Sequence, residues 1–364
     1  MPRRTATLLT SVLLLTGLLC AAVLIRVPYA EMSPGPTVNT LGEHGGEPVL
    51  SIPGEQTYEP SGHLNMTTVR VTGVNYRMNL VEAVHGWLSG ERAVVPHETL
   101  YPDDRSADEV EEENAEEFSR SQESAKVAAL EQLGYEVDSY TIVDSVIKDS
   151  PAENALHAGD AILAVDGTPV TRPAEVAELV TGRDAGEDVV ITVVPAEAAE
   201  AARAAGQAPG PERAEDVTIT TASAQDDGRA IVGIQAGSAH VFPFEIEIEL
   251  ADVGGPSAGL MFALGLIDKL TPEDLTGGSF VAGTGTIDYD GRVGPIGGVA
   301  MKTIAARSKG AEYFLTPEAN CSAAAADVPE GLTLVRVGTI DDALDALEDI
   351  RQGNDADLAV CAAG

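Results

Sequence analysis

The sequence predicts a mixed α+β protein that follows a single N-terminal apolar helix. Residues 6–25 form an uncharged, largely apolar run. Residues 140–195 alternate between strand-like and helical composition, which indicates a domain that combines both kinds of element. The segment Phe244–Leu250 alternates apolar residues with glutamates, as a half-buried strand does, and it precedes a helical segment that begins near Ser257.

The N-terminal run is long enough to cross a membrane. At 1.5 Å per residue it spans about 30 Å, the thickness of a bilayer core. Arg3 and Arg4 precede the run and predict a cytoplasmic N-terminus with the rest of the chain outside the membrane. Because no clear small-x-small cleavage site follows, we expect an uncleaved single-pass anchor within residues 1–30. A cleaved signal peptide is the alternative.

The charge of the chain restricts its partners. It carries 58 acidic and 22 basic residues, a formal net charge of -36. Such a surface repels nucleic acid and argues against peripheral binding to an anionic lipid surface. Hydrophobic residues make up 44% of the chain, enough for a proper core. We therefore expect an acidic, soluble body outside the cytoplasm and no nucleic-acid partner.

Two of the three cysteines lie near the C-terminus. Cys20 belongs to the apolar run, whereas Cys321 and Cys361 belong to the body. In an oxidising compartment such a pair is expected to form a disulfide. We therefore predict that Cys321 and Cys361 tie the C-terminal tail to the last domain, with two free buried thiols as the alternative.

The middle of the chain resembles a bacterial PDZ domain. The matching motifs are Ser150-Pro151-Ala152, Gly159-Asp160 and Val165-Asp166-Gly167. The resemblance implies a domain that takes extended peptide ends by adding a strand to a sheet edge. Leu133–Tyr135 is a candidate carboxylate-binding loop, with a helix end as the alternative. Within this region we expect residues 196–208 to form an exposed excursion and residues 217–223 the closing strand.

A serine motif follows the predicted strand Phe244–Leu250. Gly255, Ser257 and Gly259 fit the pattern G-x-S-x-G of a nucleophile elbow. Pro256 suits the first position of a helix, which would place Ser257 at a helix N-terminus with free backbone N–H groups nearby. Those groups could hold an oxyanion. The alternative is an inert N-capping serine.

The sequence leaves few candidates for the general base. All six histidines precede Ser257, which excludes the Ser–Asp–His order of the α/β-hydrolases. Lys269 would lie about 18 Å away along the helix axis, and Lys309 is a solvated helix-end residue. Lys302 has apolar neighbours, so burial could lower its pKa from ~10.4 to near 7. The sequence therefore predicts that neutral Lys302 takes the proton of Ser257.

Three ordered motifs resemble the proteolytic domain of the Lon family. They read "GGPSAG", "TGTI" and "GRVGPIGGVAMK". The resemblance implies that Ser257 is the nucleophile, that Lys302 is the general base and that Thr284 bonds the lysine. The backbone around Gly255 is then expected to support the oxyanion.

The resemblance extends upstream of the PDZ-like segment. "HLNMTTV" resembles an early strand of the protease domain, and "QESAKVAALEQL" resembles its first long helix. The arrangement is similar to membrane-anchored, PDZ-containing Lon-like serine proteases of Gram-positive bacteria. It implies a ribosomal protein S5 domain 2-like proteolytic fold with an inserted PDZ domain. The expected ranges are an anchor at 1–30, an extended leader at 31–60, a first protease segment at 61–135, the PDZ domain at 136–228 and the catalytic segment at 229–364.

The expected activity follows from these parts. The phosphate-binding motif G-x-x-x-x-G-K-[ST] does not occur, so we expect no nucleotide, and the sequence indicates no cofactor or metal. We expect an ATP-independent extracytoplasmic serine endopeptidase that acts on unfolded or tail-exposed polypeptides, with a homo-oligomer as one option for its assembly. Two alternatives remain: a PDZ adaptor on an inactive protease scaffold, and a regulator that cuts only its own chain.

Overall fold

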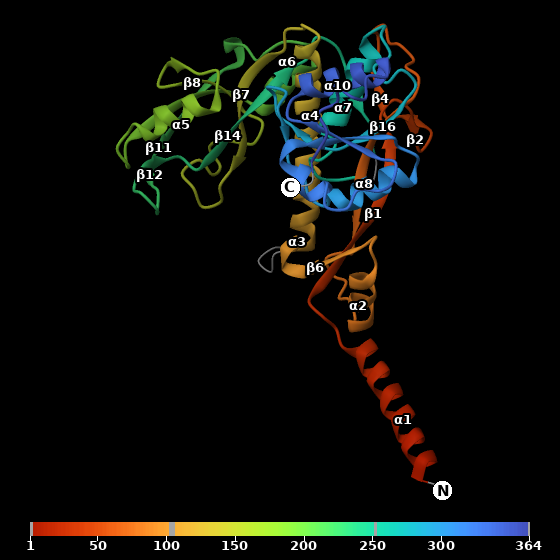
Figure 1. Ribbon diagram of the computed structural model, residues 1–364. Coiled ribbons are helices and arrows are strands. Elements are labelled where there is room, and N and C mark those ends of the chain that lie inside the picture. The colour runs from red at the N-terminus through yellow and green to blue at the C-terminus, as the bar shows by residue number, and fades with distance from the viewer. Residues whose placement is uncertain (1–2, 102–105, 251–252, 363–364) are drawn as a thin grey trace. The chain divides into compact units, whose positions relative to one another are not determined.

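The computed structural model describes residues 3–101, 106–250 and 253–362 (Figure 1). The chain divides into two compact units. The first combines residues 1–132 with residues 247–364, and the second comprises residues 133–246. Two distant parts of the sequence therefore build one unit, and the second unit is inserted between them.

A six-stranded sheet forms the centre of the first unit. Its order is β20-β19-β16-β5-β1-β6. The strands β5, β16, β19 and β20 run parallel, whereas β1 is antiparallel to both β5 and β6. The bounds are β1 Tyr29–Asn39, β5 His63–Val71, β6 Ala93–Pro96, β16 Phe280–Gly283, β19 Tyr313–Pro317 and β20 Thr333–Val337.

The predicted extended leader at 31–60 is not a separate segment. Its first part forms β1, which lies between β5 and β6 inside the sheet. Three of the residues that suggested a leader, Pro34, Gly35 and Pro36, fall at a register shift between Pro34 and Thr37. There the chain bulges without leaving the sheet, because a bulge tolerates residues that cannot donate to the ladder.

Two helices cover opposite faces of this sheet. Ala282 of β16 packs with Val299 and Ala306 of α8 (Val299–Ser308). A Cβ on the next residue, Gly283, would meet the Sδ atom of Met261 of α7 (Gly259–Leu270). Because consecutive strand residues point to opposite faces, α7 and α8 lie on different sides of the sheet.

Further helices and short strands complete the first unit. The long helix α4 (Ala107–Gln132) packs against α7, and α10 (Ile340–Gln352) packs against both α7 and β20 (Figure 1). The shorter elements are β2 Glu43–His44, β3 Glu47–Pro48, β4 Leu50–Ser51, α2 Leu80–Leu88, α3 His97–Leu100, β15 Glu247–Ile248, β17 Thr286–Ile287, β18 Val293–Gly294, η2 Glu318–Asn320 and α9 Cys321–Ala324.

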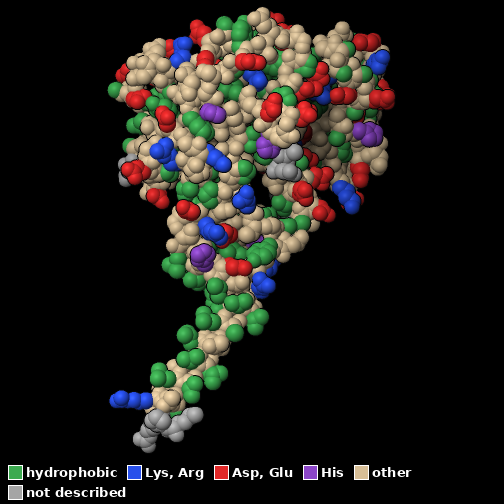
Figure 2. Space-filling model, turned by 90° about the vertical axis from the view of Figure 1, so that its right-hand side faces the viewer, with side chains coloured by type: hydrophobic (Ala, Val, Ile, Leu, Met, Phe, Trp, Pro, Cys, Tyr) green, Lys and Arg blue, Asp and Glu red, His purple; other side chains and the backbone are tan. Residues whose placement is uncertain are grey.

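The N-terminal apolar run forms helix α1 (Arg3–Leu24). Within the described part of the chain it is the one helix long and apolar enough to cross a membrane, with a mean hydropathy of 2.3 over Arg4–Leu24 and none of that span buried. Figure 2 shows hydrophobic side chains along its exposed surface.

The predicted strand Phe244–Leu250 is shorter than expected. Only Glu247–Ile248 pairs, with Leu50–Ser51 of β4. The expected alternation nevertheless holds, since Ile246 and Ile248 are buried while the glutamates between and around them are exposed. The pattern predicted which side chains face inward, but not how far the hydrogen-bonded ladder extends.

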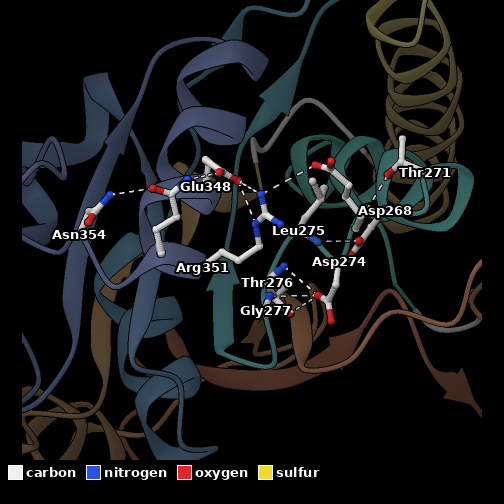
Figure 3. Close-up of polar contacts among 11 residues, drawn as sticks. Asp268, Thr271, Asp274, Leu275, Thr276, Gly277, Glu348, Arg351 and Asn354 are labelled. Carbon is white, nitrogen blue, oxygen red and sulfur yellow. Dashed lines mark hydrogen bonds and ion pairs between the residues drawn. The ribbon is translucent and has the colours of Figure 1, made fainter.

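Two aspartates hold the loop between α7 and β16. Asp274 accepts hydrogen bonds from the N–H groups of Thr276 and Gly277 at 3.1 and 3.0 Å (Figure 3). It also accepts from the N–H of Ser61 at 2.9 Å. Asp268, which is completely buried, accepts from Leu275 N–H at 2.9 Å. Burial raises the pKa of Asp268 to about 7.

The second unit is built on a sheet of order β11-β10-β8-β7-β14, with β9 paired to β8. Its core is a cluster of buried valine, isoleucine, leucine and alanine side chains that includes Val176 of α5 and Ile191 of β10. The bounds are β7 Asp138–Val146, β8 Ala161–Val165, β9 Thr168–Pro169, α5 Pro173–Thr181, β10 Asp188–Val194, α6 Ala196–Ala204, η1 Pro211–Arg213, β11 Glu215–Thr220, β12 Ala222–Ser223, β13 Ala230–Ile231 and β14 Ile234–Val241.

Two features of this unit differ from the sequence expectation. Residues 196–208 are not simply an excursion, because α6 buries Ala199 in a cluster with Tyr140 and Val241. The unit also continues beyond 228 to Ile246, because β14 pairs with β7 along its whole length. This pairing joins residues about 90 positions apart, which local patterns do not reveal.

Candidate active site

Ser257 lies in the short turn that precedes α7. The helix begins at Gly259 and not at Pro256, so Pro256 and Ser257 belong to the turn. Gly255 adopts φ +81°, a left-handed conformation that strongly favours glycine. The first glycine of the motif therefore permits the turn that presents Ser257.

The second glycine of the motif permits close packing. A Cβ on Gly259 would lie 2.9 Å from both the Oγ atom of Ser121 and a methyl group of Ile287. Ser121 of α4 donates a hydrogen bond of 2.9 Å to the carbonyl of Pro256. The serine turn is thus fastened to α4, whose apolar and acidic sequence gives no local sign of this role.

Lys302 reaches the site from the first turns of α8. Its side chain is 3% exposed, and burial lowers its pKa to about 7. Gly298 caps the start of the helix with φ +69°, and a Cβ there would lie 2.9 Å from side-chain atoms of Met32 and Val69. The glycine therefore allows α8 to approach β1 and β5 closely enough to bury the lysine.

Three oxygen atoms surround the Nζ atom of Lys302. The distances are 2.7 Å to Ser257 Oγ, 3.0 Å to Thr284 Oγ1 and 3.0 Å to the carbonyl oxygen of Thr67. A neutral amine has two N–H bonds and one lone pair. If its N–H bonds go to Thr67 and Thr284, its lone pair faces the hydroxyl of Ser257, which is the arrangement a general base needs.

Thr284 links the serine and the lysine. It follows directly after β16 and is completely buried. Its hydroxyl donates to the carbonyl oxygen of Ser257 at 3.0 Å, so its lone pairs are left to accept from Lys302. The N–H of Gly285 also donates to the Ser257 carbonyl, at 2.9 Å. The structure therefore brings Ser257, Thr284 and Lys302 together as the sequence motifs suggested.

The carbonyl of Thr67 is a part of the site that sequence reasoning missed. Thr67 lies in β5, and its own hydroxyl donates to the carbonyl of Gly283 at 3.0 Å. Every residue carries a backbone carbonyl, so no residue type marks one that will accept from a buried lysine. Only the register that sets β5 beside β16 could have indicated it.

The expectation for Gly255 needs a correction. Its N–H donates to the carbonyl of Asn114 in α4 at 2.9 Å. In this conformation that N–H is already used within the chain and does not point to an oxyanion. Gly255 therefore shapes the turn through its backbone conformation.

A pocket of about 500 Å³ opens beside Ser257 and Lys302. Its walls are mainly apolar and include Met32 of β1, Met66 and Val69 of β5, and the serine turn. Arg70 is the one arginine among its lining residues. Such a pocket can take an apolar side chain next to the reacting atom.

The second unit has a groove of its own. It lies between α5 and the chain from β13 to β14, and it is lined by Val176, Val180, Ile231 and Ile234 among others. β14 forms one edge of the sheet. Gly233 adopts φ +81° within Val232–Ile234, a turn at the end of this groove that the sequence analysis did not single out. Leu133–Tyr135, in contrast, follow the end of α4, where Gly134 has φ +80°.

The remaining candidates lie away from the serine. Cys321 and Cys361 form a disulfide, and Cys20 is a free, exposed cysteine of α1. Among residues 3–101, 106–250 and 253–362, no group of three or more His, Cys, Asp or Glu residues is placed to hold a metal ion.

Comparison with known protein families matches both units. The profile of the Lon protease (S16) C-terminal proteolytic domain matches residues 251–348, and that of the PDZ domain matches residues 142–195. The PDZ domain of an SdrC-like protein from Listeria monocytogenes is similar at 22% identity, over 27% of this chain and 86% of that one, with a TM-score of 0.20.

Curated relatives match the catalytic part of the chain. The Lon protease of Phenylobacterium zucineum is 39% identical over 104 residues, which cover 28% of this chain and 13% of the relative. Lon protease 2 of Bacillus subtilis is 36% identical over 97 residues, which cover 26% and 17%. The chain thus spans less than a fifth of these relatives. It carries the proteolytic domain of the Lon serine proteases together with a PDZ domain.

Proposed function

We propose that this protein is an ATP-independent serine endopeptidase that acts outside the cytoplasm through a Ser257–Lys302 dyad. The observation that carries the proposal is the 2.7 Å contact between Lys302 Nζ and Ser257 Oγ. Burial lowers the pKa of this lysine to about 7, so that a large share of it is neutral near neutral pH. A neutral amine at this distance can accept the serine proton.

The chemistry is an acyl transfer in two steps. Lys302 takes the proton of Ser257 as Oγ attacks the peptide carbonyl, and the tetrahedral intermediate collapses when Lys302 returns that proton to the leaving amine. Water then attacks the resulting ester, with Lys302 accepting its proton and returning it to Ser257. Thr67 and Thr284 hold the amine in place throughout, because both accept its N–H groups.

Two features support the independence from ATP and the location. The sequence lacks a phosphate-binding loop of the form G-x-x-x-x-G-K-[ST], the part that would hold a nucleotide. Helix α1 has the length and composition of a single membrane span, and Arg3 and Arg4 before it favour a cytoplasmic N-terminus. The protease body would then lie on the other side of the membrane.

The groove of the second unit suggests how substrates are selected. A peptide can add to the free edge of β14 while its side chains enter the groove against α5. The unit would thereby capture unfolded or tail-exposed polypeptides for the dyad.

The proposal is tested with the full-length chain in detergent, an unfolded fluorescent protein as substrate and no nucleotide. We expect cleavage by the parent and loss of at least 10³-fold in Ser257→Ala and Lys302→Ala. Lys309→Ala is the matched control, because Lys309 is an exposed lysine at the end of the same helix and should be dispensable.

Undiminished cleavage by Ser257→Ala would disprove the proposal. Substrate binding without cleavage by the parent would favour an adaptor, and cleavage of its own chain alone would favour a self-processing regulator.

A further inference from the structure

Helix α2 presents an apolar face to solvent. Its five large apolar side chains are exposed by 37% to 83%, namely Leu80, Val81, Val84, Trp87 and Leu88. At 100° per residue these five lie within an arc of about 120° on the helix surface. Trp87 and Leu88 are the most exposed of them, at 80% and 83%. An apolar arc of this kind needs a partner, because a soluble surface helix normally turns such a face inward.

The helix is held so that this arc stays outward. Its other side, Ala83 and Gly86, is buried. A Cβ on Gly86 would lie 2.7 Å from a methyl group of Val94 in β6, so the helix backbone rests directly on the sheet. At the start of the helix, Asn79 and Glu82 form a reciprocal capping box. Rolling α2 to bury the arc would break these contacts, so the exposed face is a stable property of the fold.

The chain that leaves α1 runs directly alongside the start of α2. The N–H of Leu80 donates to the carbonyl of Ile25 at 3.1 Å, and the N–H of Val27 donates to the carbonyl of Met78 at 2.9 Å. The apolar arc therefore begins beside the end of α1, the one helix among the described residues that is long and apolar enough to cross a membrane. Figure 2 shows hydrophobic side chains continuing from this helix onto the adjoining part of the body.

The charges around α2 also suit a membrane surface. The chain as a whole is acidic, which argues against purely electrostatic binding to lipid, but two carboxylates beside α2, those of Glu31 and Glu82, are engaged. Glu31 pairs with Arg92 at 2.8 Å, and Glu82 accepts from Tyr76 at 2.8 Å and from the N–H of Asn79. Arg26 lies two residues beyond the end of α1 and donates to the carbonyl of Arg77 at 3.0 Å. Arginines at this level can reach lipid headgroups.

We propose that α2 lies in the membrane–water interface, with its apolar arc inserted among the lipid headgroups and upper acyl chains. The inference rests on the proposed function in one respect, that α1 spans the membrane. An interfacial helix with Trp and Leu on its lipid side is a recognised way to bind a bilayer surface, and tryptophan favours this depth. The catalytic unit is then held to the membrane at two points, α1 and α2, and cannot swing freely about a single tether.

Trp87 is the one tryptophan of the chain, so its fluorescence reports on α2 alone. The full-length Ser257→Ala chain is reconstituted in phosphatidylcholine vesicles, a neutral lipid that keeps the net charge from deciding the outcome. We expect emission at shorter wavelength than in unfolded chain, strong quenching by phosphatidylcholine brominated on the upper acyl chain, and weak quenching by aqueous iodide. Introducing Val84→Glu should reverse both quenching results, since it places a charge at the centre of the arc. The matched control, His85→Glu, adds the same residue outside the arc and should leave them unchanged.

Two further outcomes would overturn the proposal. Strong quenching by iodide with none by brominated lipid would show α2 in water. Protection from both quenchers would show a protein partner, such as a second copy of this chain. Flotation of the vesicles tests separately whether the chain is bound to the membrane at all. A chain that does not float overturns the membrane span by α1 and the α2 contact together, whereas a floating chain with Trp87 in water overturns the α2 contact alone.

Discussion

The Nζ atom of Lys302 lies 3.0 Å from the carbonyl oxygen of Thr67, a contact that joins α8 to β5 across 235 positions of the sequence. Together with Thr284 Oγ1 it gives the amine two acceptors on the sides away from Ser257. The lysine is therefore oriented as well as buried.

Thr284 should act by positioning Lys302. Thr284→Val removes the hydroxyl that accepts from Lys302 and donates to the Ser257 carbonyl. Leaving a buried partner without its hydrogen bond costs about 1–3 kcal/mol, so the substitution should lower kcat by roughly 10- to 100-fold. The acidic limb of the pH profile should also move to lower pH, because an acceptor stabilises the ammonium more than the amine. Thr284→Ser restores the hydroxyl and should recover both values; a Ser variant as impaired as Val would mean that the methyl group matters instead.

Activity should rise with pH through the pKa of Lys302. The lysine works as a base only when neutral, and burial lowers its pKa to about 7. Below this value the ammonium predominates and kcat/KM should fall about tenfold per pH unit; above it kcat/KM should level off. The measurement is peptide hydrolysis from roughly pH 5 to 10, a range that includes the ordinary lysine pKa of ~10.4. A limb near that ordinary value would show that burial does not lower the pKa of the base.

The bond from α4 to the serine turn should contribute to activity. Ser121→Ala removes the 2.9 Å hydrogen bond to the Pro256 carbonyl. We expect a loss of about 1 kcal/mol, seen as a several-fold fall in kcat with a small fall in Tm. Ser119→Ala is the matched control, since Ser119 is an exposed serine on the same helix. Equal effects of the two substitutions would contradict a specific role for Ser121.

Asp268 should make the stability of the first unit depend on pH. Burial raises its pKa to about 7, above the unfolded value of ~3.9. The contribution of Asp268 to the free energy of unfolding is therefore most favourable below pH ~4. It is lost as the pH rises toward 7, at about 1.4 kcal/mol per pH unit. Asp268→Asn keeps the acceptor for Leu275 N–H and removes the ionisation, so it should raise Tm more at pH 8 than at pH 5. Asp345→Asn, an exposed carboxyl on α10, should change Tm little at either pH. A pH-independent difference between Asp268→Asn and the parent would count against a buried, titrating carboxyl.

The sequence predicted the side chains of the candidate site, but not the backbone groups around them or the start of α7. Ser257, Thr284 and Lys302 stand in motifs whose residue types are unusual, and the structure brings them within hydrogen-bonding distance; their catalytic roles remain proposals. The carbonyls of Thr67 and Asn114 could not be foreseen, because backbone atoms carry no residue-specific signal. The start of α7 at Gly259 was also missed, since Pro256 is equally at home in a turn.

The fold shows a similar division. Alternation within Phe244–Leu250 and helical composition after Ser257 were local patterns, and both correspond to what the structure shows. The place of β1 between β5 and β6 and the pairing of β14 with β7 depend on partners far away in the chain. The local composition did not predict these pairings, because it does not encode strand register. β1 contains proline and glycine, and the expected excursion precedes β14.

The disulfide between Cys321 and Cys361 has a consequence for the outer strand of the sheet. Beside it, the N–H of Arg336 donates to the carbonyl of Ala359, and the N–H of Cys361 donates to the carbonyl of Leu334, so the C-terminal tail lies along β20. An uncovered strand at this position would be a template for any extended chain, including the unfolded polypeptides that such a protein is proposed to handle. The cross-link holds the tail over this edge of β20, where it would keep other extended chains from pairing, whereas β14 is the edge strand at which a peptide is proposed to bind.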